Sequence, residues 1–323
     1  MTTEPDLPPL IVLGGPTGTG KTALAIALAE ALATPGRPIE IVSADSRQVY
    51  RGLDIGTAKV TPAERARVVH HGLDLVDPDQ PFSVADFRAD ALEALGRLAR
   101  RGGVGILAGG TGFWLRAVVG GLDTDALPAD ATVRAALEDR LAREGLDALV
   151  AELRQRAPVL ASGIDVRNPR RVVRALEIAM LAGDRPRPPA RGYPAPVLSL
   201  VLDVDPAVHR ERLAARAQAQ FAAGLIEEAR ALRERFDPRL PAFSAIGYRE
   251  AWDVLDGRAT LDEAIETDAR RNVQFAKRQR TWFRREPGDR IDATGDPIGA
   301  AFARVRPWLA DPPAGPELPV SGD

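Results

Sequence analysis

The sequence predicts an α/β fold in which helices flank a parallel sheet and a phosphate-binding loop (P-loop) follows the first strand. Three observations predict it. Short, unbroken apolar runs, typical of strands buried on both faces, recur along the chain. Segments rich in the helix formers Ala, Leu, Glu and Arg separate these runs. The first run leads directly into a glycine-rich segment that ends in Lys and Thr.

The predicted strands are the four apolar runs at 10–13, 39–43, 104–108 and 197–202. A pattern of strong helix formers at about 22–32 follows the first of them. Because parallel strands present their carboxyl ends at one edge of a sheet, the segments that follow these runs are expected to build the functional site.

The domain organisation follows from where the strand pattern stops. We expect residues 1–120 and 197–310 to form the two parts of the P-loop core, the second with a basic helical region. An all-helical insertion domain is expected over 121–196, where helical patterns alone occur. The polar, proline-rich tail 311–323 is expected to be disordered.

The composition excludes several kinds of chemistry. The 323 residues contain no cysteine, which rules out disulfides, thiolate zinc sites, iron–sulfur clusters and cysteine nucleophiles. The N-terminal segment lacks the pattern of a secretory signal, and no apolar stretch approaches the roughly 18 residues that span a bilayer. We therefore expect a cytoplasmic protein without a membrane partner.

Charge is balanced overall but not locally. The 43 basic and 45 acidic residues give a net charge of -2, yet eight basic residues stand against two acidic ones between 270 and 290. Only three of the basic residues are lysines, namely Lys21, Lys59 and Lys277. Because arginine has replaced lysine almost everywhere, these three are candidates for sites that need a compact point charge.

The glycine-rich segment matches the pattern G-x-x-x-x-G-K-[ST] between a strand and a helix, which indicates a phosphate-binding loop. Its glycines let successive backbone N–H groups surround an anion, to which Lys21 adds a full charge, and the Thr22 hydroxyl can ligate Mg²⁺. A glycine-rich turn without a ligand is the alternative. The motif comprises Gly15, Pro16, Thr17, Gly18, Thr19, Gly20, Lys21 and Thr22.

The candidate general base is Asp45. In P-loop kinases and hydrolases a second apolar strand ends in an Asp that holds Mg²⁺. Here the run at 104–108 ends instead in Gly109-Gly110-Thr111. Asp45 follows the run at 39–43, so it is expected beside the loop, where it could accept a proton or orient water on a metal. A cap for a following helix is the alternative.

Two further features of the C-terminal half remain open from the residues alone. Arg212 and Arg216 lie four apart on a predicted helix and could clamp phosphate oxygens or form a solvated face. The segment 277–285 interleaves cations with Trp282 and Phe283. This composition suits a nucleic-acid contact, and equally a basic helix that buries both aromatic rings.

Together these residues resemble the tRNA dimethylallyltransferases, also called tRNA isopentenyltransferases or IPP transferases, in their bacterial form. The ordered motifs that carry the resemblance are GPTGTGKT at 15–22, DSRQVYRGLDIGTAK at 45–59, FSVADF at 82–87, GGTGFW at 109–114, NPRRVVRALE at 168–177, GYRE at 247–250 and KRQRTWFR at 277–284. A P-loop alone is common to many families, whereas this ordered set is specific.

The resemblance implies a reaction. Members of the family transfer a five-carbon prenyl group from dimethylallyl diphosphate to N6 of adenosine-37, beside the tRNA anticodon. Carried over to this chain, the loop 15–22 would hold the diphosphate, with Mg²⁺ on Thr22. Asp45 would accept the N6 proton, Thr111 would bridge substrate and leaving group, and Arg216 would bind the diphosphate.

The resemblance also implies where tRNA binds. The extruded adenine would lie among Asp45, Ser46, Arg47 and Gln48. Contacts to the anticodon stem-loop would come from Arg134, Arg170, Arg171, Arg174, Ser244, Gly247, Tyr248, Arg249, Lys277, Arg278, Gln279, Arg280, Trp282 and Arg284. Ser244 and Val273 stand where many members have arginine. Arg270 or Arg271 is a candidate to replace the arginine that is missing at Val273.

Three alternative functions stay open at this point. A P-loop kinase or NTPase would transfer or release a nucleotide phosphate. An adenylate isopentenyltransferase would prenylate a free nucleotide, although the basic segment favours RNA. A nucleotide-gated RNA-binding protein would do no chemistry. We further expect a monomer.

Overall fold

The computed structural model describes residues 6–121, 127–185 and 192–313. The chain divides into two compact units: a core unit, Met1–Gly120 with Gly192–Asp323, and a helical unit, Gly121–Arg191. The helical unit corresponds to the insertion expected over 121–196. Most of the tail expected to be disordered, residues 314–323, lies outside the described residues.

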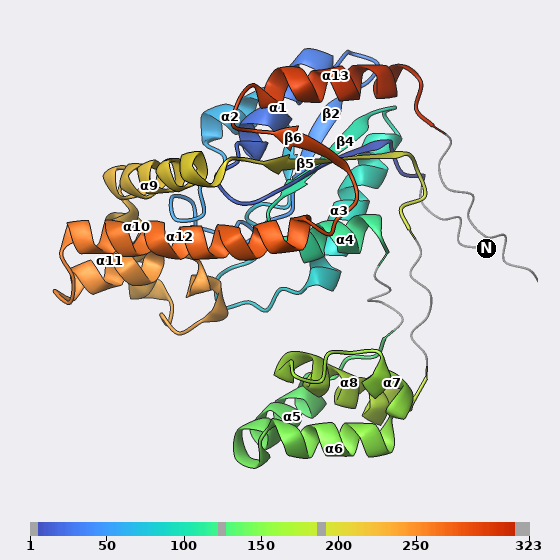
Figure 1. Cartoon of the computed structure of the whole chain (residues 1–323), viewed down its shortest axis with the longest axis vertical. Helices are drawn as coiled ribbons and strands as arrows, with labels where there is room; N and C mark the ends of the chain where they lie inside the picture. Colours follow the sequence, from blue (N-terminus) through green and yellow to red (C-terminus); the bar gives the residue numbers. More distant parts are fainter. Residues whose placement is uncertain (1–5, 122–126, 186–191, 314–323) are drawn as a thin grey trace, which may run out of the picture. The chain divides into compact units, whose positions relative to one another are not determined.

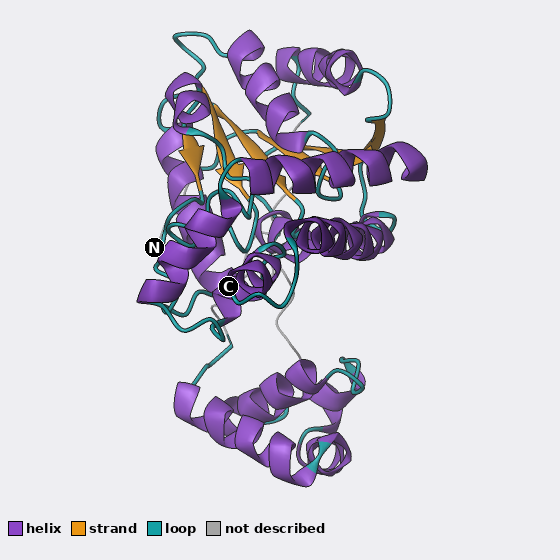
Figure 2. Cartoon of the chain, turned by 90° about the vertical axis from the view of Figure 1, so that its left-hand side faces the viewer, coloured by secondary structure: helices purple, strands orange, loops and turns teal. Residues whose placement is uncertain are grey.

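The core unit contains one six-stranded parallel sheet with strand order β3-β2-β4-β1-β5-β6 (Figures 1 and 2). The strands are β1 (Leu10–Gly14), β2 (Ile39–Ser43), β3 (His70–His71), β4 (Val104–Gly109), β5 (Val197–Asp203) and β6 (Asp289–Asp292). The predicted α/β class and the four predicted strands are confirmed. The sequence pattern did not predict the two short strands β3 and β6; β6 has four residues, of which only Ile291 is buried.

Helices cover both faces of this sheet. They are α1 (Lys21–Leu32), α2 (Pro62–Arg67), α3 (Val84–Ala99), α4 (Gly112–Val119), α9 (Pro206–Ala222), α10 (Leu225–Arg235), the 3₁₀ turn η1 (Pro241–Ser244), α11 (Tyr248–Leu255), α12 (Leu261–Phe283) and α13 (Pro297–Ala310). Side chains of β1 alternate between the two faces: Leu10 and Val12 pack with α3, α4 and α10–α12, whereas Ile11 and Leu13 pack with α1 and α13.

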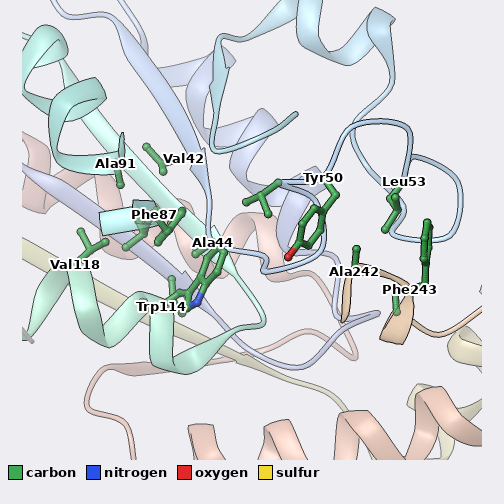
Figure 3. Packing of buried hydrophobic residues seen from close by; sticks show 14 of the residues in the cluster. Val42, Ala44, Tyr50, Leu53, Phe87, Ala91, Trp114, Val118, Ala242 and Phe243 are labelled. Atoms are coloured by element: carbon green, nitrogen blue, oxygen red, sulfur yellow. The ribbon is translucent and has the colours of Figure 1, made fainter. Parts of the chain in front are cut away.

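The first of these cores fixes the helices that follow β4. Phe87 of α3 and Trp114 of α4 stack with ring centroids 4.3 Å apart, among Val42, Ala91 and Val118 (Figure 3). Such offset aromatic pairs add stability beyond the area that they bury. The packing anchors α4, and with it the preceding Gly109-Gly110-Thr111 segment, against the end of β2.

The helical unit has its own core. Its helices are α5 (Ala131–Glu144), α6 (Leu146–Arg156), α7 (Pro158–Ser162) and α8 (Pro169–Ala182). Leu149 and Leu153 pack against Val172 and Leu176 of α8. None of the helices in the described ranges combines the length and the apolar character needed to cross a bilayer.

Candidate active site

The glycine-rich loop has the strand–loop–helix form expected of a phosphate-binding loop. Gly15, Gly18 and Gly20 all have positive φ, and a Cβ on Gly15 would lie 2.6 Å from the Leu202 carbonyl oxygen. Helix α1 begins at Lys21 without a side-chain cap. Its first N–H groups are therefore free to bind an anion in the loop.

Lys21 lies inside this loop. Its Nζ donates to the carbonyl oxygen of Pro16 at 2.6 Å. Burial lowers the pKa of Lys21 to about 7, with the nearby Asp45 carboxylate raising it and the Arg216 guanidinium lowering it further. The loop thus brings Lys21 close to Asp45 and Arg216, two of the predicted catalytic residues. An ammonium in this position gains from a bound anion, which replaces the water that it has lost.

Asp45 directly follows β2, at the carboxyl edge of the sheet. Its Oδ1 accepts the backbone N–H of Arg47 at 2.9 Å. The alternative of a helix cap is wrong, because residues 46–51 form turns and the next helix, α2, begins only at Pro62. Thr111 lies alongside: its Oγ1 accepts the N–H of Ser46 at 3.2 Å, which joins the ends of β2 and β4.

Two pockets meet at these residues. The loop pocket, about 440 Å³, is lined by Gly18, Lys21 and Thr22 among others. The adjoining pocket, about 270 Å³, is lined by Ser46, Arg47, Thr111, Ser244, Arg271 and Arg278 among others. Four residues line both: Thr17, Asp45, Thr57 and Arg216. A molecule in one pocket would therefore meet a molecule in the other at Asp45 and Arg216.

Arg212 and Arg216 of α9 have different roles. Arg216 is partly buried, and its Nη1 donates to Thr17 Oγ1 at 2.7 Å. Burial lowers its pKa, which the carboxylates of Asp45 and Asp268 partly offset. Arg212 also lines the loop pocket, but its Nη1 donates to the Ala293 carbonyl at 2.8 Å. Only Arg216 reaches the loop itself, and neither arginine forms a solvated face.

Helix α12 turns different residues inward and outward. Lys277, Arg278 and Arg284 are exposed, as a polyanion contact requires. Gln279, which was expected to contact tRNA, is buried: its Oε1 accepts the Thr17 N–H and its Nε2 donates to Gly110 O, both at 2.9 Å. A Cβ on Gly110 would approach Gln279 Nε2 to 2.5 Å, which explains the glycine there.

The two aromatic rings at the end of α12 belong to the core. Phe283 is buried against Gly14, and Trp282 packs against Gly112 with the Arg116 guanidinium 4.5 Å from its ring centroid. The Trp282 ring thus lies against Gly112 and Arg116 of α4, and its expected contact with tRNA stays a prediction. Burial of Phe283 and partial burial of Trp282 favour the alternative of a basic helix that turns its aromatic rings toward the core.

Arg280 is likewise turned toward the protein. It donates through Nε to Asp203 Oδ1 at 3.2 Å and through Nη2 to Val204 O at 3.3 Å. These bonds commit the guanidinium to the end of β5. The expected contact of Arg280 with the anticodon stem-loop stays a prediction.

The GYRE motif also divides between core and surface. Tyr248 is fully buried and its hydroxyl donates to Glu228 Oε1 at 2.7 Å. Gly247 is buried as well, and the RNA contacts expected of these two residues stay predictions. Ser244 and Arg249 are exposed. Glu228 also accepts the N–H groups of residues 54–56 and so holds the loop that carries Thr57.

Of the two candidate substitutes for the absent arginine, Arg271 lines the adjoining pocket and pairs with Glu250. Arg270 is exposed and donates to Thr267. Gln48 lines the loop pocket and not the adjoining one, and its Nε2 donates to the carbonyl of Thr57 at 3.1 Å.

In the helical unit, Arg170 and Arg171 are exposed at the start of α8. Arg134 and Arg174 instead pair with Glu177, a fully buried carboxylate that also accepts the Asp130 N–H at 2.8 Å. Their charges are thus balanced within the unit, and the structure gives them a structural role.

Lys59 confirms the idea that the rare lysines occupy sites needing a compact cation. Its side chain is 1% exposed, and Nζ donates to Asp54 Oδ1 and Asp74 Oδ1 at 2.6 Å and to Tyr50 O at 2.9 Å. Three acceptors around one point match an ammonium better than a planar guanidinium.

We expect Lys59→Met to lower the free energy of unfolding by about 1–3 kcal/mol, because it leaves the buried Tyr50 carbonyl oxygen without its donor and removes the ammonium that pairs with Asp54 and Asp74. Urea denaturation followed by circular dichroism measures the loss. Lys277→Met, on the exposed side of α12, is the matched control and should change the stability by less than about 0.5 kcal/mol. Equal stability of the two variants would contradict the role given to Lys59.

His209 and Asp268 escaped the sequence interpretation, and Gln279 was given another role there. All three are buried polar residues beside the loop or Arg216. Burial raises the pKa of Asp268 to about 6, with Glu250 adding to the effect. A signal was available for His209, which lies seven residues before Arg216 and therefore on the same face of a helix.

The fold and the loop define a class: parallel α/β proteins in which the first strand ends in a glycine-rich loop suited to phosphate groups. Comparison with known proteins then identifies the family. The chain belongs to the IPP transferase family, whose model matches residues 48–286. The resemblance predicted from the ordered motifs is confirmed.

Among its relatives, the tRNA dimethylallyltransferase of Thermus thermophilus is 47% identical over 306 residues, which cover 92% of this chain and 96% of the relative. That of Bordetella avium is 42% identical, covering 87% and 91%. A crystal structure of the tRNA isopentenylpyrophosphate transferase of Bacillus halodurans, 36% identical, superimposes with a TM-score of 0.66 over 93% of this chain and 95% of that one.

A eukaryotic dimethylallyltransferase captured acting on tRNA has the same fold, with a TM-score of 0.75 over 96% of this chain and 81% of that one. At 24% identity this likeness bears on the fold alone.

Proposed function

We propose that the protein transfers the dimethylallyl group from dimethylallyl diphosphate to N6 of adenosine-37 in tRNA and releases diphosphate. The observation that carries the proposal is that Asp45 and Arg216 line both pockets. Membership of the IPP transferase family supports prenyl transfer over phosphoryl transfer. One chain supplies both pockets, so the proposed reaction needs no second copy of the chain. Because the proposed substrate is tRNA, we also propose that the protein acts in the cytoplasm.

In this proposal the diphosphate lies in the loop pocket. The backbone N–H groups at the start of α1 and the cations of Lys21 and Arg216 surround its oxygens. Opposite charge fixed around a leaving group stabilises the negative charge that develops as the C–O bond breaks. Burial of Lys21 and Arg216 strengthens this effect, because water screens them less than it would at the surface.

The adenine enters through the adjoining pocket. Its exocyclic nitrogen is a poor nucleophile, so it must be held in line with the prenyl carbon. N6 forms a bond to C1 of the dimethylallyl group while the C1–O bond breaks and its electron pair leaves with the diphosphate. The N6 proton passes to the Asp45 carboxylate, and Thr111 lies beside Asp45 to orient the reacting groups.

Thr22 is the residue proposed to hold Mg²⁺. Its exposed hydroxyl lines the loop pocket with Ser43 and Asp45, a set of oxygen donors. Mg²⁺ in protein sites binds through a few such oxygens together with phosphate and water, so these residues fit the ion. When bound, it supplies further positive charge to the diphosphate.

The RNA surface is proposed from exposed cations and neighbours of the adjoining pocket. A loop nucleotide can leave its stack at low cost to reach a pocket. Phosphates of the anticodon stem-loop would then contact exposed or partly exposed side chains of the core unit and of the helical unit. These are Ser46, Arg47, Arg170, Arg171, Ser244, Arg249, Arg271, Lys277, Arg278 and Arg284.

The test is incubation of the protein with Mg²⁺, labelled dimethylallyl diphosphate and unmodified tRNA, followed by mass spectrometry of the anticodon loop. N6-prenyladenosine at position 37 is the expected product. Prenylation of free AMP in preference to tRNA would favour an adenylate isopentenyltransferase. Transfer or release of the γ-phosphate of labelled ATP without prenyl transfer would favour a kinase or NTPase.

A further inference from the structure

Thr17, at the tip of the glycine-rich loop, is held by three side chains from outside the loop. Arg216 of α9 donates to its hydroxyl, and Gln279 of α12 accepts its N–H. His209 of α9 contacts its carbonyl oxygen through Nε2 at 2.7 Å. Every polar atom of this one residue is therefore bonded to α9 or α12.

The partners of His209 determine its tautomer. A carbonyl oxygen only accepts hydrogen bonds, so Nε2 carries the proton that is donated to Thr17. On the other side of the ring, Arg280 Nη2 lies 3.0 Å from Nδ1. Because a guanidinium only donates, Nδ1 must be the unprotonated acceptor. Both bonds thus require the neutral ring with hydrogen on Nε2.

We propose that His209 is a positioning residue that fixes the tip of the phosphate-binding loop through the Thr17 carbonyl and connects that loop to α12 through Arg280. The inference deepens the proposed function and depends on it only for the identity of the anion that the loop binds. A Cβ on Gly18 would lie 3.5 Å from His209 Nε2, so the ring also packs directly under the residue that follows Thr17.

Protonation of the ring would disrupt this arrangement. A second N–H on Nδ1 would point at the Arg280 guanidinium, which cannot accept it. Burial lowers the pKa of His209, and the charges of Arg280 and Lys21 lower it further, whereas the Thr17 carbonyl and Asp203 raise it. The neutral ring is therefore maintained at pH 7 and lost as the pH falls through the lowered pKa, below the usual value of about 6.5.

The test measures binding of inorganic diphosphate with Mg²⁺ by calorimetry, without RNA, at pH 8 and at a series of lower pH values. His209→Phe removes the donor, and its Kd should rise about tenfold at pH 8, the effect of one lost buried hydrogen bond. His209→Gln keeps an amide N–H that can reach Thr17, so its Kd at pH 8 should stay within about threefold of that of the wild type.

The pH dependence separates positioning from packing. Lys21, Asp268 and diphosphate itself also titrate between these pH values, so the result is read as the ratio of the Kd of the wild type to that of His209→Gln. This ratio should rise as the pH falls through the lowered pKa of His209, because only the wild-type ring gains a proton there. The control is His71→Gln, which removes a histidine that bonds Glu40 at the far edge of the sheet. The ratio of the Kd of the wild type to that of His71→Gln should stay at one at every pH.

Two results would overturn the inference: a Kd for His209→Phe equal to that of the folded wild type, or identical pH profiles for the wild type and His209→Gln. Should His209→Phe not fold, the comparison with His209→Gln decides alone. The expected binding results without any prenylation of tRNA would uphold the role of His209 and refute the proposed function, so the two failures are distinguishable.

Discussion

Asp45→Asn is expected to lower kcat for prenyl transfer by about 10²–10⁴-fold, the usual contribution of a general base. The amide has nearly the shape of the carboxylate and can still accept the Arg47 N–H, so the turn that positions the residue is kept. It cannot take the N6 proton. Single-turnover transfer of a labelled prenyl group to tRNA measures the loss.

The control is Asp79→Asn, an exposed carboxylate in a turn away from both pockets, which should leave kcat unchanged. Binding of tRNA to Asp45→Asn, followed by gel shift, should stay within a few-fold of the wild type, because RNA affinity comes mainly from phosphate contacts. A kcat equal to that of the wild type would show that another group accepts the proton.

Lys21→Arg is expected to reduce activity by about 10²–10³-fold, the size of effect seen when one preorganised charge is lost from an active site. Lys21 Nζ lies 2.6 Å from the Pro16 carbonyl within the curve of the loop. A planar guanidinium is larger and presents its donors in a different geometry, so it would displace either the loop or the diphosphate. Steady-state kinetics with varied prenyl donor measures the loss.

The exposed residue Arg100 supplies the reverse substitution as a control: Arg100→Lys should be silent. Full activity of Lys21→Arg would contradict the need for a compact cation in the loop.

The same site predicts that binding of diphosphate is accompanied by uptake of a proton. Since the pKa of Lys21 is about 7 before the anion binds, most of the side chain is neutral at pH 8, and a bound diphosphate favours its charged form.

Binding at pH 8 should therefore take up close to one proton at Lys21, and the uptake should shrink as the pH falls below 7, where the lysine is already charged. Calorimetry in buffers of different ionisation enthalpy measures this number. Lys21→Met should lose the uptake together with most of the affinity. An uptake that persists in Lys21→Met would assign the proton to the ligand or to another group.

Periodicity and motif spacing predicted the strands that are buried on both faces, because such strands are continuous apolar runs. They could not predict β3 and β6, which have two and four residues and lie at the two edges of the sheet. The short strands are defined by pairing with a neighbour, at His71 with Val42 and at Ile291 with Leu202. Such pairing leaves almost no trace in local composition.

The same distinction applies to the site. The loop and Asp45 were predicted because each directly follows a recognisable strand. The direction in which a helical residue points was not: Gln279 and Trp282 stand among exposed cations in the sequence, yet they face the loop and α4. Only the packing of α12 against the carboxyl edge of the sheet decides which of its residues RNA could reach.

The order of the sheet has a consequence for biosynthesis. Strand β1 lies inside the sheet, paired on one side with β4 and on the other with β5. The helical unit lies between β4 and β5 in the sequence, so β5 is synthesised only after that whole unit. A nascent chain that has emerged only as far as residue 196 thus leaves one edge of β1 without its neighbour. Exposed apolar strand edges promote aggregation. We expect ribosome-bound chains stalled at this length to recruit chaperones, and chains that include β5 to release them.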